Sequence, residues 1–336
     1  MQVDKSINVC AAFNFLPPEI IDHFTAITGI NVYIDSMPDE DLAIVKHCAG
    51  INVYDIVIIT AGHLFHRYIA ANVYRSMPYK TIIDMAHINP MILEKYSVVD
   101  PLLTHGVPFL YSFGGIAYNK NVLQYTTGMS EIANFKTLFH PAFLQLLGGY
   151  GIAMPESHNE TFVLAALSTG DDIKTFNANN FQKSIAIMYN IMYSVKKFTY
   201  SALPDLLIGG VGCGICSMGD IMIANAEAMI GFNLPNEGTC MRIDAIAIPQ
   251  NAQNVECAVI FMKYLTHPMV AAYITNKLYI ANVIINANKY VYHHILANKN
   301  IYPDHAYLQK CYIDMIYVFG ESLSRILSSI KLGVNE

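Results

Sequence analysis

Cys213 and Cys216 form a CxxC motif, a spacing known from redox centres and metal sites. A CxxC pair can form a redox centre or supply half of a zinc site. A structural zinc ion takes four ligands, and the sequence has no second CxxC pair. A redox pair usually opens a helix, whereas the residues around Cys213 favour a strand. We therefore interpret both cysteines as small side chains of a packed strand.

Two pairs of histidines could bind a metal ion: His63 with His66, and His293 with His294. Neither pair has the HExxH frame of a metal-binding helix or an evident carboxylate partner. Histidines of this kind more often lie at the surface or hydrogen-bond within a core. The sequence therefore predicts no metal site.

No set of residues forms an evident nucleophile, base and oxyanion hole. The glycines between Gly209 and Gly214 lack GxGxxG spacing, no GxxxxGK[ST] motif is present, and Ser217 has no GxSxG frame. The motifs therefore do not favour an enzyme, and no cofactor is expected. An enzyme that uses Cys216 or a nearby acid stays open, and a thiol that reacts at neutral pH would favour it.

The composition predicts a folded protein with a large core. The chain has 336 residues, of which 54% are hydrophobic and 14% charged, and this length suits two lobes of ordinary domain size. The net charge is −6 and the basic residues form no cluster, so a nucleic-acid partner is not expected. A mildly acidic protein suits a cationic ligand, although net charge alone selects no particular one.

Neither a membrane-spanning helix nor a disulfide framework is expected. The stretch from Pro101 to Asn119 has no charged residue, but its prolines and glycines favour strands and turns. The seven cysteines are odd in number and irregular in spacing. The first residues lack the basic and apolar regions of a signal peptide, so the chain is either cytosolic or a mature form whose leader was removed.

The first third of the sequence alternates predicted strands with predicted helices. Such alternation implies an α/β fold with a parallel sheet and helices on both faces, in which ligands bind beyond the carboxyl ends of the strands. The expected strands are 7–12, 30–34, 54–60, 151–154, 213–217, 228–232 and 245–248. The expected helices begin near Pro17-Pro18 and Pro38 and cover 159–167, 255–265 and 268–274.

Six segments in register resemble bacterial spermidine/putrescine-binding proteins, the soluble components of polyamine importers. They are Leu16-Pro-Pro-Glu-Ile-Ile-Asp-His-Phe-Thr-Ala-Ile-Thr-Gly-Ile-Asn-Val, Tyr54-Asp-Ile-Val-Ile, Val107-Pro-Phe-Leu-Tyr with Gly115-Ile-Ala-Tyr-Asn, Asp244-Ala-Ile-Ala-Ile-Pro-Gln-Asn-Ala, Ala258-Val-Ile-Phe-Met-Lys-Tyr-Leu-Thr-His-Pro and Ile301-Tyr-Pro-Asp. Their order and spacing match over nearly the whole chain.

The resemblance implies a type II periplasmic-binding-protein fold, in which two α/β lobes joined by a hinge hold a ligand between them. Lobe 1 is expected at 1–118 with 244–288, and lobe 2 at 119–243 with 289–336. In this family the protein delivers a polyamine to an ABC transporter permease in the inner membrane. The resemblance also favours a mature periplasmic protein, and we expect a monomer.

Matching the family position by position gives a set of expected ligand contacts. Asp244 lies where the family has its principal amine-binding aspartate, and Glu160 matches another acidic position. The other matched positions are Phe15, Thr60, Tyr279 and Asp314. Acids can accept charge-assisted hydrogen bonds from ammonium groups, and aromatic faces suit the methylenes and cations of a polyamine.

The chain departs from the family at several of these positions. It has no tryptophan, and Ala12, Ser217 and Arg242 stand where tryptophan is common. Ser217 and Arg242 are included among the expected ligand contacts at these positions. Gly62 replaces a frequent tyrosine and Ser157 an aspartate. The same fold could therefore bind an anion, an amino-acid-like zwitterion or a metal complex, with Arg242 as an anion contact.

Each matched residue also has a purely structural interpretation. Asp244 could pair with Arg242, and Glu160 could be a first-turn acid that stabilises a helix. Thr60 could cap the helix that follows it. Tyr279 could be a core aromatic residue, and Phe15 an apolar wall.

Overall fold

The computed structural model describes residues 5–11, 15–36, 40–51, 53–83, 85–170 and 178–313. The chain forms two compact units: unit 1 comprises 1–111 and 242–298, and unit 2 comprises 112–241 and 299–336. The lobes expected from the sequence, 1–118 with 244–288 and 119–243 with 289–336, remain a prediction. The boundaries of the expected lobes and those of the two units fall at neighbouring points of the chain.

Unit 1 contains a sheet that has six strands among the described residues, in the order β11-β4-β10-β3-β1-β2. Strands β1, β2 and β3 run parallel, whereas β10 is antiparallel to β3 and β11 is antiparallel to β4. The strands are β1 (Ser6–Ala11), β2 (Asn31–Ser36), β3 (Ile56–Thr60), β4 (Val107–Phe113), β10 (Met241–Ala247) and β11 (Ala281–Asn282). The core strand β3 is an apolar run with only its last residue partly exposed, as expected for a strand covered on both faces.

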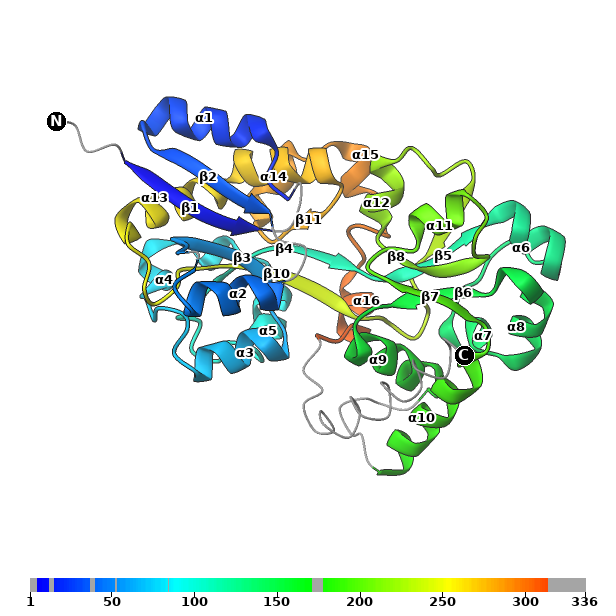
Figure 1. The fold of residues 1–336 in the computed structure, drawn as a ribbon. Coiled ribbons are helices and arrows are strands. Elements are labelled where there is room, and N and C mark those ends of the chain that lie inside the picture. Colours follow the sequence, from blue (N-terminus) through cyan, green and yellow to red (C-terminus); the bar gives the residue numbers. More distant parts are fainter. Residues whose placement is uncertain are drawn as a thin grey trace. The chain divides into compact units, whose positions relative to one another are not determined.

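Helices cover both faces of this sheet, with α1 and α14 on one face and α2, α3 and α5 on the other (Figure 1). The helices are α1 (Pro18–Thr28), α2 (Glu40–Cys48), α3 (His63–Ala70), α4 (Tyr79–Ile82), α5 (Pro90–Tyr96), α13 (Val255–Leu265), α14 (Pro268–Leu278) and α15 (His293–Leu296), with 3-10 turns η1 (Met85–His87) and η4 (Ile285–Tyr290). Helix α1 starts at a proline and ends at Gly29, whose φ of 70° lets its N–H donate to Thr25 O.

Unit 2 contains a second sheet, which has five strands among the described residues in the order β7-β6-β8-β5-β9. Its strands are β5 (Gly115–Asn119), β6 (Ile152–Pro155), β7 (Val195–Thr199), β8 (Cys213–Cys216) and β9 (Ile230–Asn233). Strand β6 is parallel to β7 and β8, whereas β5 is antiparallel to β8 and β9. Strands β6 and β8 therefore end at the same edge of the sheet.

Alternate residues of the unit 2 strands enter two separate apolar cores. Ile152 and Met154 belong to the larger core, whereas Ala153 belongs to the smaller one, which is the alternation that a strand imposes. The helices are α6 (Lys120–Thr127), α7 (Phe135–Leu138), α8 (Pro141–Leu147), α9 (His158–Ser168), α10 (Ala178–Met192), α11 (Leu203–Leu207), α12 (Met218–Ile223) and α16 (His305–Lys310), with a 3-10 turn η2 (Gly148–Tyr150). Helices on both faces, as the sequence predicts, are confirmed for this sheet.

The expected strands and helices are present, with ends that shift by a few residues. Helix α13 has the predicted bounds, and the CxxC segment is strand β8. The expectation of parallel sheets is wrong for the strands that enter from the other unit. Strands β10 and β5 are antiparallel to their neighbours β3 and β8, because each begins where the chain crosses between units and not after a crossover helix.

Within the described ranges, no single helix has the length and apolar composition that crossing a membrane requires. Helices α13 and α14 reach that composition only as a pair, and they are bent by 69° at the break between them.

Candidate ligand-binding site

Asp244 and Thr60 lie opposite each other on neighbouring strands of unit 1. The two residues pair in the β10–β3 register, and the Thr60 hydroxyl donates to Asp244 Oδ1 at 3.2 Å. Both side chains are partly exposed. Helix α3 has Gly62 at its N-cap without a side-chain cap, so capping that helix is not the role of Thr60. The Thr60 hydroxyl, at the carboxyl end of β3, instead orients the Asp244 carboxylate of β10.

Arg242 points to the same face of β10 as Asp244, because side chains two residues apart share a face of a strand. Residues 242 and 244 are partly exposed, whereas Met241, Ile243 and Ala245 are buried. The cation and the acid therefore share one accessible strip of β10, and either could contact a ligand there.

A second acid of unit 1 shows what a purely structural carboxylate looks like. Asp55 is 2% exposed, and its oxygens accept hydrogen bonds from the backbone N–H groups of Asn8, Gln253 and Asn254 at 3.0, 3.0 and 2.7 Å. This carboxylate fastens β1 to the start of α13. Asp244, with a hydroxyl donor and an accessible face, is the better candidate for a ligand contact.

Two aromatic candidates lie on different elements of unit 1. Phe15 follows β1 and is half-buried, with its ring 6.3 Å from that of Phe109 on β4. Tyr279 ends α14 in the left-handed conformation, at φ 53°. Its ring lies 6.4 Å from the imidazole of His294, which stacks on Tyr292 at 5.9 Å. The sequence did not predict that Tyr279 contacts His294, because nothing in the spacing of the two residues indicates it.

In unit 2, Glu160 occupies the first turn of α9, just after the carboxyl end of β6. It is 6% exposed, and the Ser157 hydroxyl caps the helix by accepting from Glu160 N at 3.2 Å. A β-carbon at Gly114 would lie 3.0 Å from Glu160 Oε1 and 3.2 Å from Ile215 Cγ2. The carboxyl group is therefore packed against the backbone that joins β4 to β5, and Gly114 leaves the space for it.

Ser217 follows the carboxyl end of β8 and serves as the N-cap of α12. Its hydroxyl accepts from Asp220 N at 3.1 Å, and the Asp220 carboxylate accepts from the Ser217 N–H, which completes a capping box. Asp220 Oδ2 also accepts from Ser201 Oγ at 2.9 Å. Ser217 thus has a structural role that the sequence interpretation did not anticipate, and a ligand contact remains a prediction.

The candidates of each unit gather beyond the ends of parallel strands, where α/β sheets bind ligands. In unit 1 these are Phe15 after β1 and Thr60 at the end of β3. In unit 2 they are Glu160 after β6 and Ser217 after β8. Asp314 lies outside the described residues.

The thiols of the CxxC pair are unsuited to nucleophilic chemistry. Burial raises the pKa values of Cys213 and Cys216 well above the ordinary range of a thiol, and Asp220 raises that of Cys216 further. All seven cysteines are free thiols, and Cys48 is exposed. The described part of the chain contains no group of three His, Cys, Asp or Glu residues suited to a metal ion.

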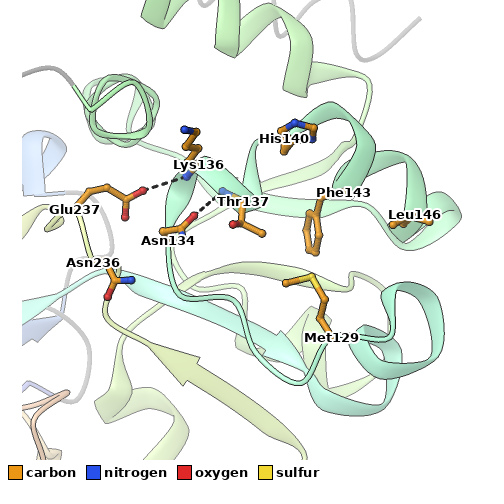
Figure 2. A pocket seen from close by; sticks show the side chains of 9 residues that line it. All are labelled: Met129, Asn134, Lys136, Thr137, His140, Phe143, Leu146, Asn236 and Glu237. Carbon is orange, nitrogen blue, oxygen red and sulfur yellow. Dashed lines mark hydrogen bonds between the residues drawn. The ribbon is translucent and has the colours of Figure 1, made fainter.

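A surface hollow of about 600 Å³ lies elsewhere in unit 2 (Figure 2). Its walls combine Met129, Phe143 and Leu146 with polar groups around the start of α7. There Asn134 accepts from Thr137 N at 2.7 Å, and Glu237 accepts from Lys136 N at 3.2 Å. None of the residues predicted to bind the ligand lines this hollow, so it is separate from the candidate site.

The sequence model for bacterial extracellular solute-binding proteins matches residues 19–290. The chain belongs to this family. Among its relatives, the putrescine-binding periplasmic protein SpuD of Pseudomonas aeruginosa strain UCBPP-PA14 is 26% identical over 98% of this solute-binding protein and 93% of SpuD. The putrescine-binding periplasmic protein PotF of Escherichia coli K12 is 23% identical, over 89% of this chain and 83% of PotF.

Solved structures confirm the fold expected for this solute-binding protein. The spermidine/putrescine ABC transporter substrate-binding protein PotD of Streptococcus pneumoniae, in complex with calcium and HEPES, matches with a TM-score of 0.83. It is 17% identical and the match covers 98% of this chain and 99% of PotD. A spermidine/putrescine ABC transporter from Listeria monocytogenes matches with a TM-score of 0.80 at 18% identity, over 97% and 99% of the two chains. The fold is therefore the α/β type II periplasmic-binding-protein fold.

Proposed function

We propose that this solute-binding protein binds a polyamine such as putrescine or spermidine and delivers it to the permease of an ABC importer. One observation carries the proposal: Asp244 is an accessible carboxylate, oriented by the Thr60 hydroxyl at 3.2 Å, at the strand end of unit 1. The names of SpuD and PotF support the choice of ligand, since both proteins are putrescine-binding.

The chemistry of the candidates suits a chain of ammonium groups and methylenes. In the proposal, an ammonium group donates to the Asp244 carboxylate, and this charge-assisted hydrogen bond contributes about 1.5–3 kcal/mol. Phe15 and Tyr279 supply apolar and aromatic surface, and a cation over an aromatic face adds about 0.5–2 kcal/mol. Glu160 supplies a second acid.

The same proposal places the mature protein in the periplasm, as a monomer without catalytic activity. The relatives SpuD and PotF are periplasmic proteins, which supports the location. The raised pKa values of the two buried CxxC thiols argue against a catalytic role for Cys216. Incubation of the native protein with a thiol reagent at neutral pH should leave both cysteines unmodified, whereas rapid reaction at Cys216 would revive the enzyme hypothesis.

Calorimetric titration of putrescine and spermidine tests the function directly. Because Asp244→Asn removes the charge but keeps the size of the side chain, it should weaken binding about 10–100-fold. Asp22→Asn is the matched control, since Asp22 is an exposed acid on α1 of the same unit, and its affinity should equal that of the wild type. Equal affinities of the Asp244→Asn variant and the wild type would contradict the proposal.

A second candidate ligand class is an anion or a zwitterion, because Arg242 shares the accessible face of β10 with Asp244. Arg242→Ala separates the two classes. A polyamine-binding protein should keep or improve its affinity when a nearby positive charge is removed. If the protein instead recognises an anion, the wild type should bind a carboxylate-bearing solute, and the Arg242→Ala variant should lose that binding.

A further inference from the structure

Two buried tyrosines of unit 1 have hydroxyl groups that the described residues do not fully satisfy. Tyr79 on α4 and Tyr96 on α5 are both 0% exposed. Within the part of the chain that the structure describes, the Tyr96 hydroxyl and the buried Nε of Arg75 have no hydrogen-bond partner. The Tyr79 hydroxyl is likewise unsatisfied apart from a backbone hydrogen bond with Ile248, which lowers its pKa. Leaving such groups without a partner in a protein interior is costly.

The Tyr96 hydroxyl lies in a buried polar cluster. Tyr96 Oη lies 2.7 Å from the position that a β-carbon of Gly106 would take, and Ile246 O lies 3.4 Å from the same point. Asp100, which is 1% exposed, accepts from His105 N at 2.7 Å and contacts His105 Nδ1 at 3.1 Å. Gly106 follows these residues directly, so the carboxylate, the carbonyl and the phenol belong to one locality.

Electrostatic coupling connects Tyr79 to the same cluster. Burial raises the pKa of Tyr96 well above its ordinary value, and Asp100, Tyr79 and Tyr74 raise it further. Burial also raises the pKa of Tyr79; a hydrogen bond with the Ile248 backbone lowers it, the Asp100 charge raises it and the Arg75 charge lowers it. Asp100 therefore acts on both phenols, and Tyr79 lies beside the segment that follows β10.

We propose that this cluster is a buried hydration site, in which one or more water molecules bridge the hydroxyls of Tyr79 and Tyr96 to the polar groups around Asp100. Water fits the chemistry because the cluster offers both donors and acceptors. The phenols and Arg75 Nε can donate, whereas the Asp100 carboxylate and Ile246 O can accept. Buried waters typically make about three hydrogen bonds to such groups, and folded proteins hold about one per 27 residues.

A monovalent ion fits the same cluster less well. The Asp100 carboxylate would repel an anion, and the Arg75 guanidinium would repel a cation, since both charges act on Tyr79. Water carries no charge and can turn to suit both kinds of group. In this site it links residues 75–106 to the segment 246–248, which stabilises the position of β10 within unit 1.

The sign of a stability change tests the proposal. If water bridges the phenols, Tyr96→Phe removes a hydrogen bond, and the melting temperature of the ligand-free protein should fall by about 2–4 °C. Adding Tyr79→Phe should cost less than the sum of the two single changes, because both disrupt one network. If the Tyr96 hydroxyl has no water, removing it relieves an unsatisfied group and the melting temperature of Tyr96→Phe should rise. A rise would overturn the proposal.

Tyr125→Phe is the control, since this tyrosine is 86% exposed and its melting temperature should not change. A high-resolution crystal structure of the wild type provides an independent measurement that does not depend on any variant folding. Density for a water within hydrogen-bond distance of Tyr79 Oη and Tyr96 Oη is expected. An empty site, or density with the coordination of an ion, would contradict the proposal.

Discussion

The candidate residues of unit 1 and unit 2 are held in different ways. In unit 1, Asp244 is partly exposed and is oriented by a hydroxyl on the neighbouring strand. In unit 2, Glu160 is buried in the first turn of α9, and Ser217 caps α12. The candidate polar side chains of unit 2 thus also stabilise helix starts, whereas Asp244 and Thr60 of unit 1 do not. Substitutions should therefore separate into effects on affinity and effects on stability.

Glu160→Gln should give the largest effect of the three substitutions that test this comparison. In the proposed function Glu160 is the second acid, so losing its charge should weaken putrescine binding about 10–100-fold. Titration calorimetry measures this change. Glu131→Gln, at an exposed acid of the same unit, is the control and should bind as the wild type does. Equal affinity in the Glu160→Gln variant would assign the acid to helix stabilisation alone.

Ser217→Ala should lower stability and leave affinity nearly unchanged. The hydroxyl accepts from Asp220 N at 3.1 Å, and losing an N-cap of this kind costs about 1 kcal/mol. Thermal unfolding should show a drop of about 2–4 °C. Ser217→Asn, which retains a capping side chain, should recover most of that drop. If both variants lose affinity for putrescine, Ser217 is a ligand contact and the contrast between the units is weaker.

Thr60→Val should show the opposite pattern, with a smaller effect. The change keeps the shape of the side chain and removes the donor to Asp244 Oδ1, so affinity should fall about 3–10-fold, as expected for one hydrogen bond of about 1 kcal/mol. The melting temperature of the ligand-free protein should stay within about 1 °C. Thr60→Ser, which restores the hydroxyl, should recover the affinity. A large loss of stability in the valine variant would mean that the bond mainly holds β3 to β10.

Local sequence signals predicted much of the fold. The proline at the start of α1 and Gly29 at its end are local features, and they fix that helix almost to the residue. Strand directions were predicted less well, because the direction of β10 depends on where the chain crosses back from unit 2 and not on the residues of β10 itself.

The candidate site could be predicted only in part, for the same reason. The register with the polyamine-binding family identified Asp244 and Thr60, but their hydrogen bond joins residues 184 apart and leaves no trace in either local sequence. The cap at Ser217 was readable in principle, since Asp220 follows three residues later. The contact of Tyr279 with His294 depends on how the chain turns after α14 and has no such signal.

Strand β10 lies between β3 and β4, in the middle of the sheet of unit 1, yet it is synthesised after the whole of 112–241. A growing chain can therefore complete the sheet of unit 2 before it can insert the central strand of unit 1. Pairings between such distant segments form slowly. The acid proposed to hold the ligand consequently takes its place late in folding, and a nascent chain that ends before residue 242 lacks both that acid and the strand that carries it.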